Sequence, residues 1–218
     1  MMRALSVAVR MCFLAVFCSL APSLVLADPV ETSVWIEISR EAGVVFNGEP
    51  LPKEGEGAGV AIASREVVTA AHVVWGAEKI SVVLANGLVV PARITDIDRD
   101  LDIAILRVER PLTIFSAARM KPVVTGERVS AVERPRPNEA PRVTSANIGA
   151  TRWPSNGVLV PLIFSGIKGE KGMSGGGLFD SNGELVGIII RIDGELSYLN
   201  ALPVVELCTR FSRCSSAR

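Results

Sequence analysis

Gly172-Met173-Ser174-Gly175-Gly176-Gly177-Leu178 is the stretch whose residue types most directly suggest chemistry. Glycine adopts backbone conformations that other residues avoid. A turn rich in glycine can therefore expose the Ser174 hydroxyl and point neighbouring N–H groups toward one place, as a nucleophilic serine and its oxyanion site require. The same segment is equally compatible with an ordinary glycine turn, so other parts of the chain have to decide between the two.

His72 is the single histidine of the chain and follows the apolar run Val67–Ala71. Histidine is the side chain that most often acts as a general base near neutral pH. A lone histidine among apolar residues is nevertheless more often structural than catalytic. A single histidine also argues against zinc, which usually takes several His or Cys ligands.

Four acidic residues alternate along one short stretch, namely Asp96, Asp98, Asp100 and Asp102. The start of this stretch resembles a calcium loop, but Leu101 stands where the loop needs glycine and Arg107 where it needs glutamate. We therefore expect no metal ion and no cofactor, and we interpret the first three acids as a solvated turn. Asp102 differs because it precedes the apolar strand Ile103–Val108, where its carboxylate could orient an imidazole.

The order of these residues along the chain separates three catalytic arrangements. The α/β-hydrolase order places the histidine after the serine, and no histidine follows Ser174. The subtilisin order needs an aspartate before the histidine, and only Asp28 precedes His72. The order His72, Asp102, Ser174 fits the chymotrypsin arrangement.

Short apolar runs separated by turn signals predict an all-β barrel or sandwich. They fall into two sets, at about residues 30–110 and 122–203, and Asn86-Gly87 marks a hairpin. The segment Asn47–Gly59 is rich in glycine, proline and charge and is expected to be a solvated loop. Four residues with helical spacing predict one closing helix at about residues 203–213, namely Val204, Leu207, Cys208 and Phe211.

Residues 1–27 are typical of a secretory signal peptide, with Arg3, Arg10, an apolar run and a Val25-Leu26-Ala27 cleavage pattern. An uncleaved anchor is the alternative. We expect export to the periplasm or the medium, a remaining chain 28–218 and no stable membrane span after cleavage. That chain lacks a dense Lys/Arg stripe, so nucleic acid is not an expected partner. Cys208 and Cys214 could form a disulfide if the helix ends between them, or remain free thiols.

Three blocks together resemble the signature sequences of trypsin-like serine peptidases, and most closely their HtrA/Deg branch. They are Thr69-Ala70-Ala71-His72, Leu101-Asp102-Ile103-Ala104-Ile105-Leu106 and Gly172–Leu178. The resemblance covers nearly all of residues 28–218. It implies two six-stranded antiparallel β-barrels of the chymotrypsin type with a short C-terminal helix.

The resemblance also implies the roles of individual residues. Ser174 would be the nucleophile, His72 the general base and then acid, and Asp102 the group that orients His72. The N–H groups of Gly172 and Ser174 would form the oxyanion hole, and protein or peptide substrates would be hydrolysed through an acyl-enzyme. The substrate pocket would be lined by Lys168, Ile189, Ile190 and Arg191, which favours a small or medium apolar side chain before the cleaved bond.

Three departures from the family pattern stand out. Met173 occupies the position where digestive relatives carry an aspartate that pairs with a new N-terminus, and HtrA proteins an asparagine. Gly177 replaces the usual proline. The fifteen residues after Pro203 leave no room for a PDZ domain, so peptide sensing through such a domain is not expected. These departures keep a second hypothesis open, namely a non-catalytic protein-binding module with a misassembled triad. The oligomeric state is left open.

Overall fold

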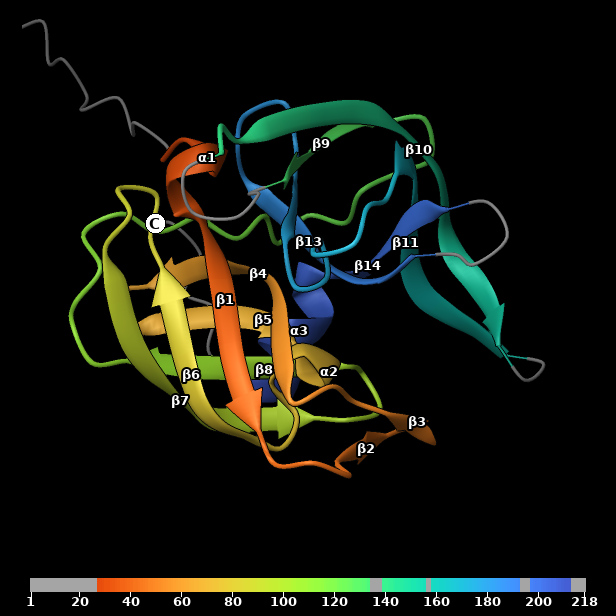
Figure 1. The fold of residues 1–218 in the computed structure, drawn as a ribbon. Coiled ribbons are helices and arrows are strands. Elements are labelled where there is room, and N and C mark those ends of the chain that lie inside the picture. The colour runs from red at the N-terminus through yellow and green to blue at the C-terminus, as the bar shows by residue number, and fades with distance from the viewer. Residues whose placement is uncertain (1–26, 134–138, 156–157, 193–196, 213–218) are drawn as a thin grey trace, which may run out of the picture.

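The computed structural model describes residues 27–133, 139–155, 158–192 and 197–212 (Figure 1). The predicted signal peptide, apart from Ala27, lies outside these residues. The elements in chain order are α1 (Pro29–Thr32), β1 (Ser33–Arg40), β2 (Val45–Phe46), β3 (Glu49–Pro50), β4 (Glu54–Ala63), β5 (Glu66–Ala70), α2 (Ala71–Val74), β6 (Ala77–Val83), β7 (Val89–Asp98), β8 (Ile103–Val108), β9 (Arg128–Glu133), β10 (Arg142–Ser155), β11 (Val158–Lys168), β12 (Gly177–Phe179), β13 (Leu185–Ile192), β14 (Tyr198–Pro203) and α3 (Val204–Phe211).

The strands close into two antiparallel barrels, with the orders β1-β4-β5-β8-β7-β6 and β10-β11-β14-β13-β12-β9. Figure 1 shows the barrels side by side, the first from orange to green and the second from green to blue. The prediction of two six-stranded barrels with a short C-terminal helix is confirmed, and the sandwich alternative is wrong. The hairpin at Asn86-Gly87 is also confirmed, because β6 and β7 pair on either side of it.

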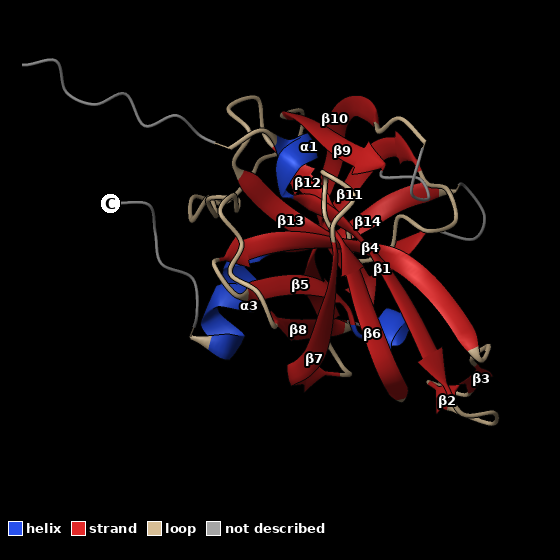
Figure 2. Cartoon of the chain, turned by 60° about the vertical axis from the view of Figure 1, so that its left-hand side comes forward, coloured by secondary structure: helices blue, strands red, loops and turns tan. Residues whose placement is uncertain are grey.

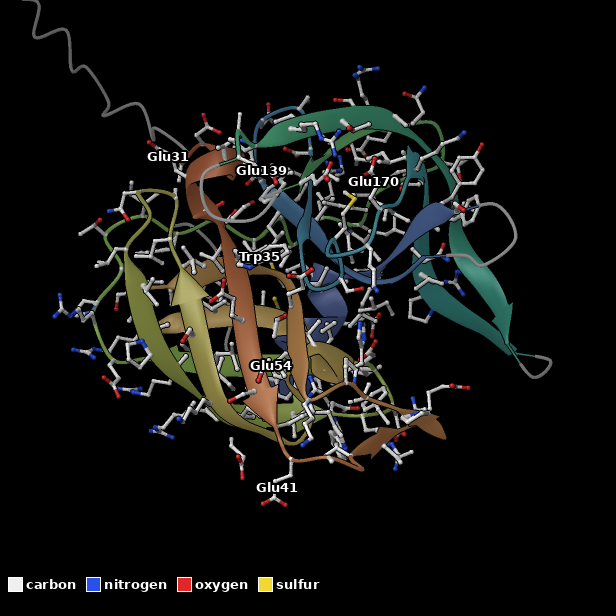
Figure 3. All side chains as sticks on the ribbon, viewed as in Figure 1. Glu31, Trp35, Glu41, Glu54, Glu139 and Glu170 are labelled. Carbon is white, nitrogen blue, oxygen red and sulfur yellow. The ribbon has the colours of Figure 1, made fainter. Side chains whose placement is uncertain are left out.

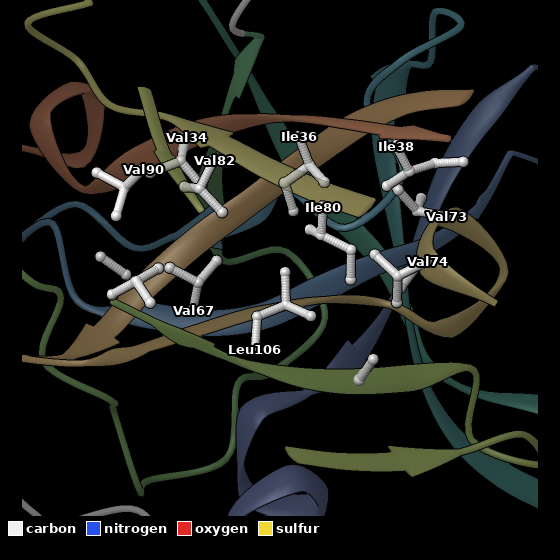
Figure 4. Close-up of a cluster of buried hydrophobic side chains, with 14 of the residues drawn as sticks. Val34, Ile36, Ile38, Val67, Val73, Val74, Ile80, Val82, Val90 and Leu106 are labelled. Carbon is white, nitrogen blue, oxygen red and sulfur yellow. The ribbon is translucent and has the colours of Figure 1, made fainter. Parts of the chain in front are cut away.

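Each barrel has its own apolar core, and a third cluster joins the two. Alternate residues of β1 point into the first barrel, and Val34 and Ile36 pack there with Leu106 (Figure 4). The joining cluster combines residues of both barrels with α3, and includes Ile105, Phe179 and Leu207. Figure 2 shows α3 beside β5 and β8 of the first barrel. The helix therefore helps to fix one barrel against the other.

The expectation of a solvated loop over Asn47–Gly59 is wrong for most of the segment, because it contains β3 and the first half of β4. The glycines that suggested a loop lie where β4 meets other elements closely. A Cβ at Gly59 would lie 2.9 Å from Ile36 Cδ1, and a Cβ at Gly57 would lie 2.8 Å from Val73 Cγ1. Glycine therefore marks close packing here rather than flexibility.

The interpretation of Asp96, Asp98 and Asp100 as a solvated turn is wrong for the first two, because both lie in β7, where Asp96 is half-buried and Asp98 is buried. The Asp98 side chain is 7% exposed, and Oδ1 accepts the main-chain N–H groups of Asp100 and Leu101 at 3.0 and 2.9 Å. Oδ2 accepts from Arg210 Nε of α3 at 2.6 Å. Burial opposes the charged form, but these hydrogen bonds and the charge of Arg210 outweigh it and hold the pKa of Asp98 below its usual value.

The C-terminal helix ends at Phe211, and Ser212 follows in the left-handed conformation with φ of 53°. Cys208 is disulfide-bonded, so the alternative of a free thiol is wrong for this residue. Cys214 lies outside the described residues. No helix among the described residues is long and apolar enough to cross a membrane.

Candidate active site

His72 and Asp102 lie in direct contact through two hydrogen bonds. His72 is on the short helix α2, which follows β5, and its Nδ1 lies 2.7 Å from Asp102 Oδ2. The main-chain N–H of His72 donates to Asp102 Oδ1 at 2.9 Å. An ionised carboxylate only accepts hydrogen bonds, so Nδ1 carries the proton and Nε2 of the neutral ring is left as the basic nitrogen. The sequence placed His72 at the end of a strand, whereas it lies on a helical turn.

Asp102 reaches His72 because its backbone adopts an unusual conformation. Its φ of 55° lies in the left-handed region, which few residues other than glycine, asparagine and aspartate adopt. Its carbonyl accepts the N–H of Ala71 at 3.0 Å, which ties the residue to the start of α2. Strained backbone of this kind persists where the surrounding contacts fix it, and it is common at functional sites.

The serine loop is fixed to both barrels through its main chain. The carbonyl of Ser174 accepts from Ala58 of β4 at 2.9 Å, and the N–H of Gly175 donates to Ile189 of β13 at 2.7 Å. Gly175 has φ of 87°, and a Cβ there would clash with the carbonyl of Ala58 and with Thr69 Oγ1. Only glycine fits at position 175, which accounts for the glycine after the serine.

Ser174 lies close to the element that carries His72. A Cβ at Gly57 would contact Val73 Cγ1 at 2.8 Å and the Ser174 carbonyl oxygen at 3.1 Å. The main chain at Gly57 therefore lies between Val73 and Ser174 and is close to both. No hydrogen bond joins Ser174 Oγ to His72 within the described part of the chain. Such bonds are often long in structures without substrate.

Two N–H groups of the serine loop have no acceptor among the described residues, namely those of Gly172 and Ser174. The intervening N–H of Met173 instead donates to the Glu170 carbonyl at 3.3 Å. Gly172 has φ of 98°, which requires glycine and orients its peptide group differently from its neighbours. The loop therefore presents two unused donors on either side of Met173.

Met173 anchors this loop by burial. Its side chain is 3% exposed and belongs to the core of the second barrel. Its sulfur accepts the Glu170 N–H at 3.3 Å, which closes the turn before the serine. Glu170 also pairs with Arg142 at 3.2 Å on the surface. The sequence marked Met173 only as a departure, because the pattern does not reveal which core the side chain enters.

The family model described as "Trypsin-like peptidase domain" matches residues 57–188 of this chain. The chain belongs to this family. Periplasmic pH-dependent serine endoprotease DegQ of Escherichia coli is 30% identical over 200 residues, which cover 78% of this chain and 41% of DegQ. Putative serine protease HhoB of Synechocystis sp. is 31% identical over 173 residues, covering 73% of this chain and 41% of HhoB. The chain spans less than half the length of these curated relatives.

A solved structure described as the HtrA-type protease AlgW with tripeptide has the same fold, with a TM-score of 0.69. The sequences are 23% identical, and the match covers 84% of this chain and 59% of that one. The resemblance to HtrA/Deg proteins drawn from the three sequence blocks is thus confirmed.

Within this trypsin-like peptidase domain, the structure places the four candidate pocket residues in different surroundings. Lys168 is exposed at the end of β11. Ile189 is fully buried in the core of the second barrel, where its carbonyl holds Gly175. Ile190 is half-buried and packs against the cluster that joins the barrels. The side chain of Arg191 lies outside the described part.

Arg40 is a contributor to the site that the sequence analysis missed. Its side chain is buried at the end of β1, and Nη2 donates to the Val73 carbonyl at 2.7 Å, at the end of the helix that carries His72. Burial lowers the pKa of Arg40. Nε and Nη1 are buried without an acceptor among the described residues. Nothing in the sequence around Arg40 distinguishes it from a surface arginine.

Proposed function

We propose that this protein is an exported serine endopeptidase that hydrolyses peptide bonds through an acyl-enzyme. The observation that carries the proposal is the pair of hydrogen bonds from His72 to Asp102, next to a serine loop with two unused N–H donors. A carboxylate that holds both the ring and the main chain of a histidine fixes its tautomer and its direction. That arrangement is what a general base for a serine requires.

The reaction follows from these positions. Ser174 Oγ attacks the carbonyl carbon of the substrate while His72 Nε2 accepts its proton. Asp102 stabilises the imidazolium that forms. The N–H groups of Gly172 and Ser174 donate to the oxyanion, and the leaving amine takes the proton from His72. Water then attacks the acyl-enzyme. His72 Nε2 accepts a proton from this water and donates it to Ser174 Oγ as the acid product leaves.

Export is proposed from the leader-like residues 1–27 and from the periplasmic description of the relative DegQ. For cleavage preference we propose a small or medium apolar side chain before the cut bond. An aspartate that would favour basic residues is absent at position 168, where the chain carries Lys168.

A non-catalytic binding module on the same fold is the second candidate. The missing hydrogen bond between Ser174 Oγ and His72 among the described residues favours it. The two candidates differ in whether the serine is chemically activated.

A fluorophosphonate probe tests this difference on protein purified after expression of the full sequence. We expect covalent labelling of the parent protein and of the control Ser64→Ala, which removes an exposed serine in a turn. We expect no labelling of Ser174→Ala. Absence of labelling in a folded parent protein would exclude the peptidase proposal and leave the binding module.

A further inference from the structure

A cavity of about 1070 Å³ lies at one end of the first barrel, outside the His72–Asp102–Ser174 site. Its walls come from α1 and the start of β1, from the turn between β6 and β7, from residues 111–114 and from residues 139–141. Its volume is in the range of cavities that hold small molecules or short peptide segments.

The described walls are mostly apolar, with the polar side chains of Asn86 and Thr113 and two carboxylates. Val34 and Leu112 are buried in the wall, while Leu88 and Ile114 are 42% and 40% exposed. Glu31 and Glu139 also line the cavity and are exposed, whereas the described lining includes no lysine, arginine or histidine. Exposed apolar side chains beside carboxylates that no described lining residue opposes with a positive charge favour a ligand with aliphatic groups and a positive charge.

Trp35 forms part of the wall and has an unmet hydrogen-bonding requirement. Its side chain is 5% exposed, and Nε1 is buried without an acceptor among the described residues. A buried indole N–H usually has a partner. A peptide brings carbonyl oxygens that can accept from Nε1 after a small rotation of the ring, which a hydrocarbon or a simple amine does not.

The same indole also touches the serine loop. A Cβ on Gly172 would lie 3.2 Å from Trp35 Cη2 and 3.3 Å from Cζ3, so the six-membered ring covers Gly172. Trp35 therefore lines the cavity and also lies against Gly172, whose N–H is one of the two unused donors of the serine loop. Movement of the ring on ligand binding would change the space available to the Gly172 peptide.

We propose that this cavity is an effector site for a peptide segment that carries aliphatic side chains and a lysine or arginine, and that Trp35 transmits its occupancy to Gly172. The binding site stands independently of catalysis. Its effect on peptide hydrolysis rests on the proposed function.

Binding is measured with Ser174→Ala protein, so that the probe is not cleaved. The probe is a blocked, fluorescein-labelled peptide Ala-Leu-Lys-Val-Leu-Lys-Ala, and its control carries glutamate in place of both lysines. The cavity variant is Glu31→Gln/Glu139→Gln. The matched control is Glu41→Gln/Glu54→Gln, which removes two exposed carboxylates that do not line the cavity (Figure 3).

We expect the lysine peptide to bind and the glutamate peptide to bind at least tenfold more weakly. The cavity variant should weaken binding about 3- to 10-fold, because exposed ion pairs contribute modestly. The matched control should stay within twofold of the parent. No binding at 1 mM peptide, equal binding of both peptides, or equal loss in both variants would overturn the proposal.

Transmission is measured by hydrogen exchange of residues 168–176 in the same Ser174→Ala background. We expect saturating lysine peptide to change the exchange rate of this segment at least threefold. In Trp35→Phe, where the shorter ring does not reach Gly172 and Nε1 is lost, the peptide should bind more weakly but still reach saturation, and the change in exchange should disappear. An unchanged rate with Trp35 present, or a change that persists in Trp35→Phe, would overturn transmission. Neither readout requires peptidase activity, so failure of this proposal can be told apart from failure of the proposed function.

Discussion

Replacement of Met173 by alanine tests whether burial of this side chain holds the serine loop in its reactive geometry. Met173 is 3% exposed within the core of the second barrel, and its sulfur accepts the Glu170 N–H at 3.3 Å. Truncation of a buried methionine to alanine costs about 2–5 kcal/mol. We take about 2 kcal/mol, because the adjoining turn is near solvent and can partly fill the space.

The main-chain bonds of Gly175 and Ser174 to the two barrels remain in Met173→Ala, so the loss should fall mainly on the turn before the serine. A cost of about 2 kcal/mol changes the ratio of ordered to open loop about 30-fold. The Gly172 N–H lies within this turn. We therefore expect fluorophosphonate labelling of Ser174 to slow measurably, by up to about 30-fold.

The labelling rate is compared at a temperature where circular dichroism shows both proteins to be folded. Met173→Leu is the matched control, because it keeps the apolar volume and removes only the sulfur, and we expect its rate within about threefold of the parent. A normal rate in Met173→Ala would refute anchoring by burial. A leucine variant as slow as the alanine variant would assign the anchor to the sulfur hydrogen bond instead.

Three further perturbations address the residues around the site. Asp102→Asn should lower the labelling rate by about 10³-fold or more, because the amide no longer fixes the His72 tautomer; a loss below tenfold would contradict this role. Arg40→Leu should change the unfolding free energy by less than about 1 kcal/mol, since a buried cation with one acceptor is replaced by an apolar side chain. The same variant should slow labelling severalfold, because the Val73 carbonyl at the end of α2 loses its hydrogen bond. A large loss of stability in Arg40→Leu with a normal labelling rate would show that Arg40 stabilises the fold and does not position α2. Because the pKa of Asp98 is lowered in the folded state, its contribution to stability is present above about pH 4 and is lost as the pH falls through the folded value. Asp98→Asn should therefore lower Tm by about 2–4 °C at pH 7, and the difference from the parent should shrink as the pH is lowered below about 4; parallel Tm curves would refute it.

The sequence predicted those parts of the fold that depend on local pattern. Alternating apolar residues and the Asn86-Gly87 turn identify strands and a hairpin, because side-chain direction in a strand has a period of two. The order of His72, Asp102 and Ser174 selected one scaffold, since the three known orders differ in which residue comes first. These features can be recognised without knowing what lies beside each strand.

Contacts between distant segments were not predictable in the same way. The glycines of β4 look like loop residues in sequence, and only their closeness to Ile36 and Val73 shows why side chains are excluded. In sequence, Asp98 resembles the exposed Asp100, and only the structure shows that α3 brings Arg210 Nε to 2.6 Å from its carboxylate. The contact of Trp35 with Gly172 joins the two barrels and has no local signature.

The anchor of the serine loop has consequences for when the site is organised. In digestive relatives of the family, the residue at position 173 is an aspartate that pairs with a newly cut N-terminus, so the loop depends on cleavage and on charge. Met173 needs no partner of opposite charge, because its stabilisation comes from burial in the second barrel. The nearby Arg142–Glu170 pair is 60% exposed at both side chains, so solvent screens it and it contributes little to the loop. The loop geometry should therefore be present in the uncut chain and change little between low and high salt.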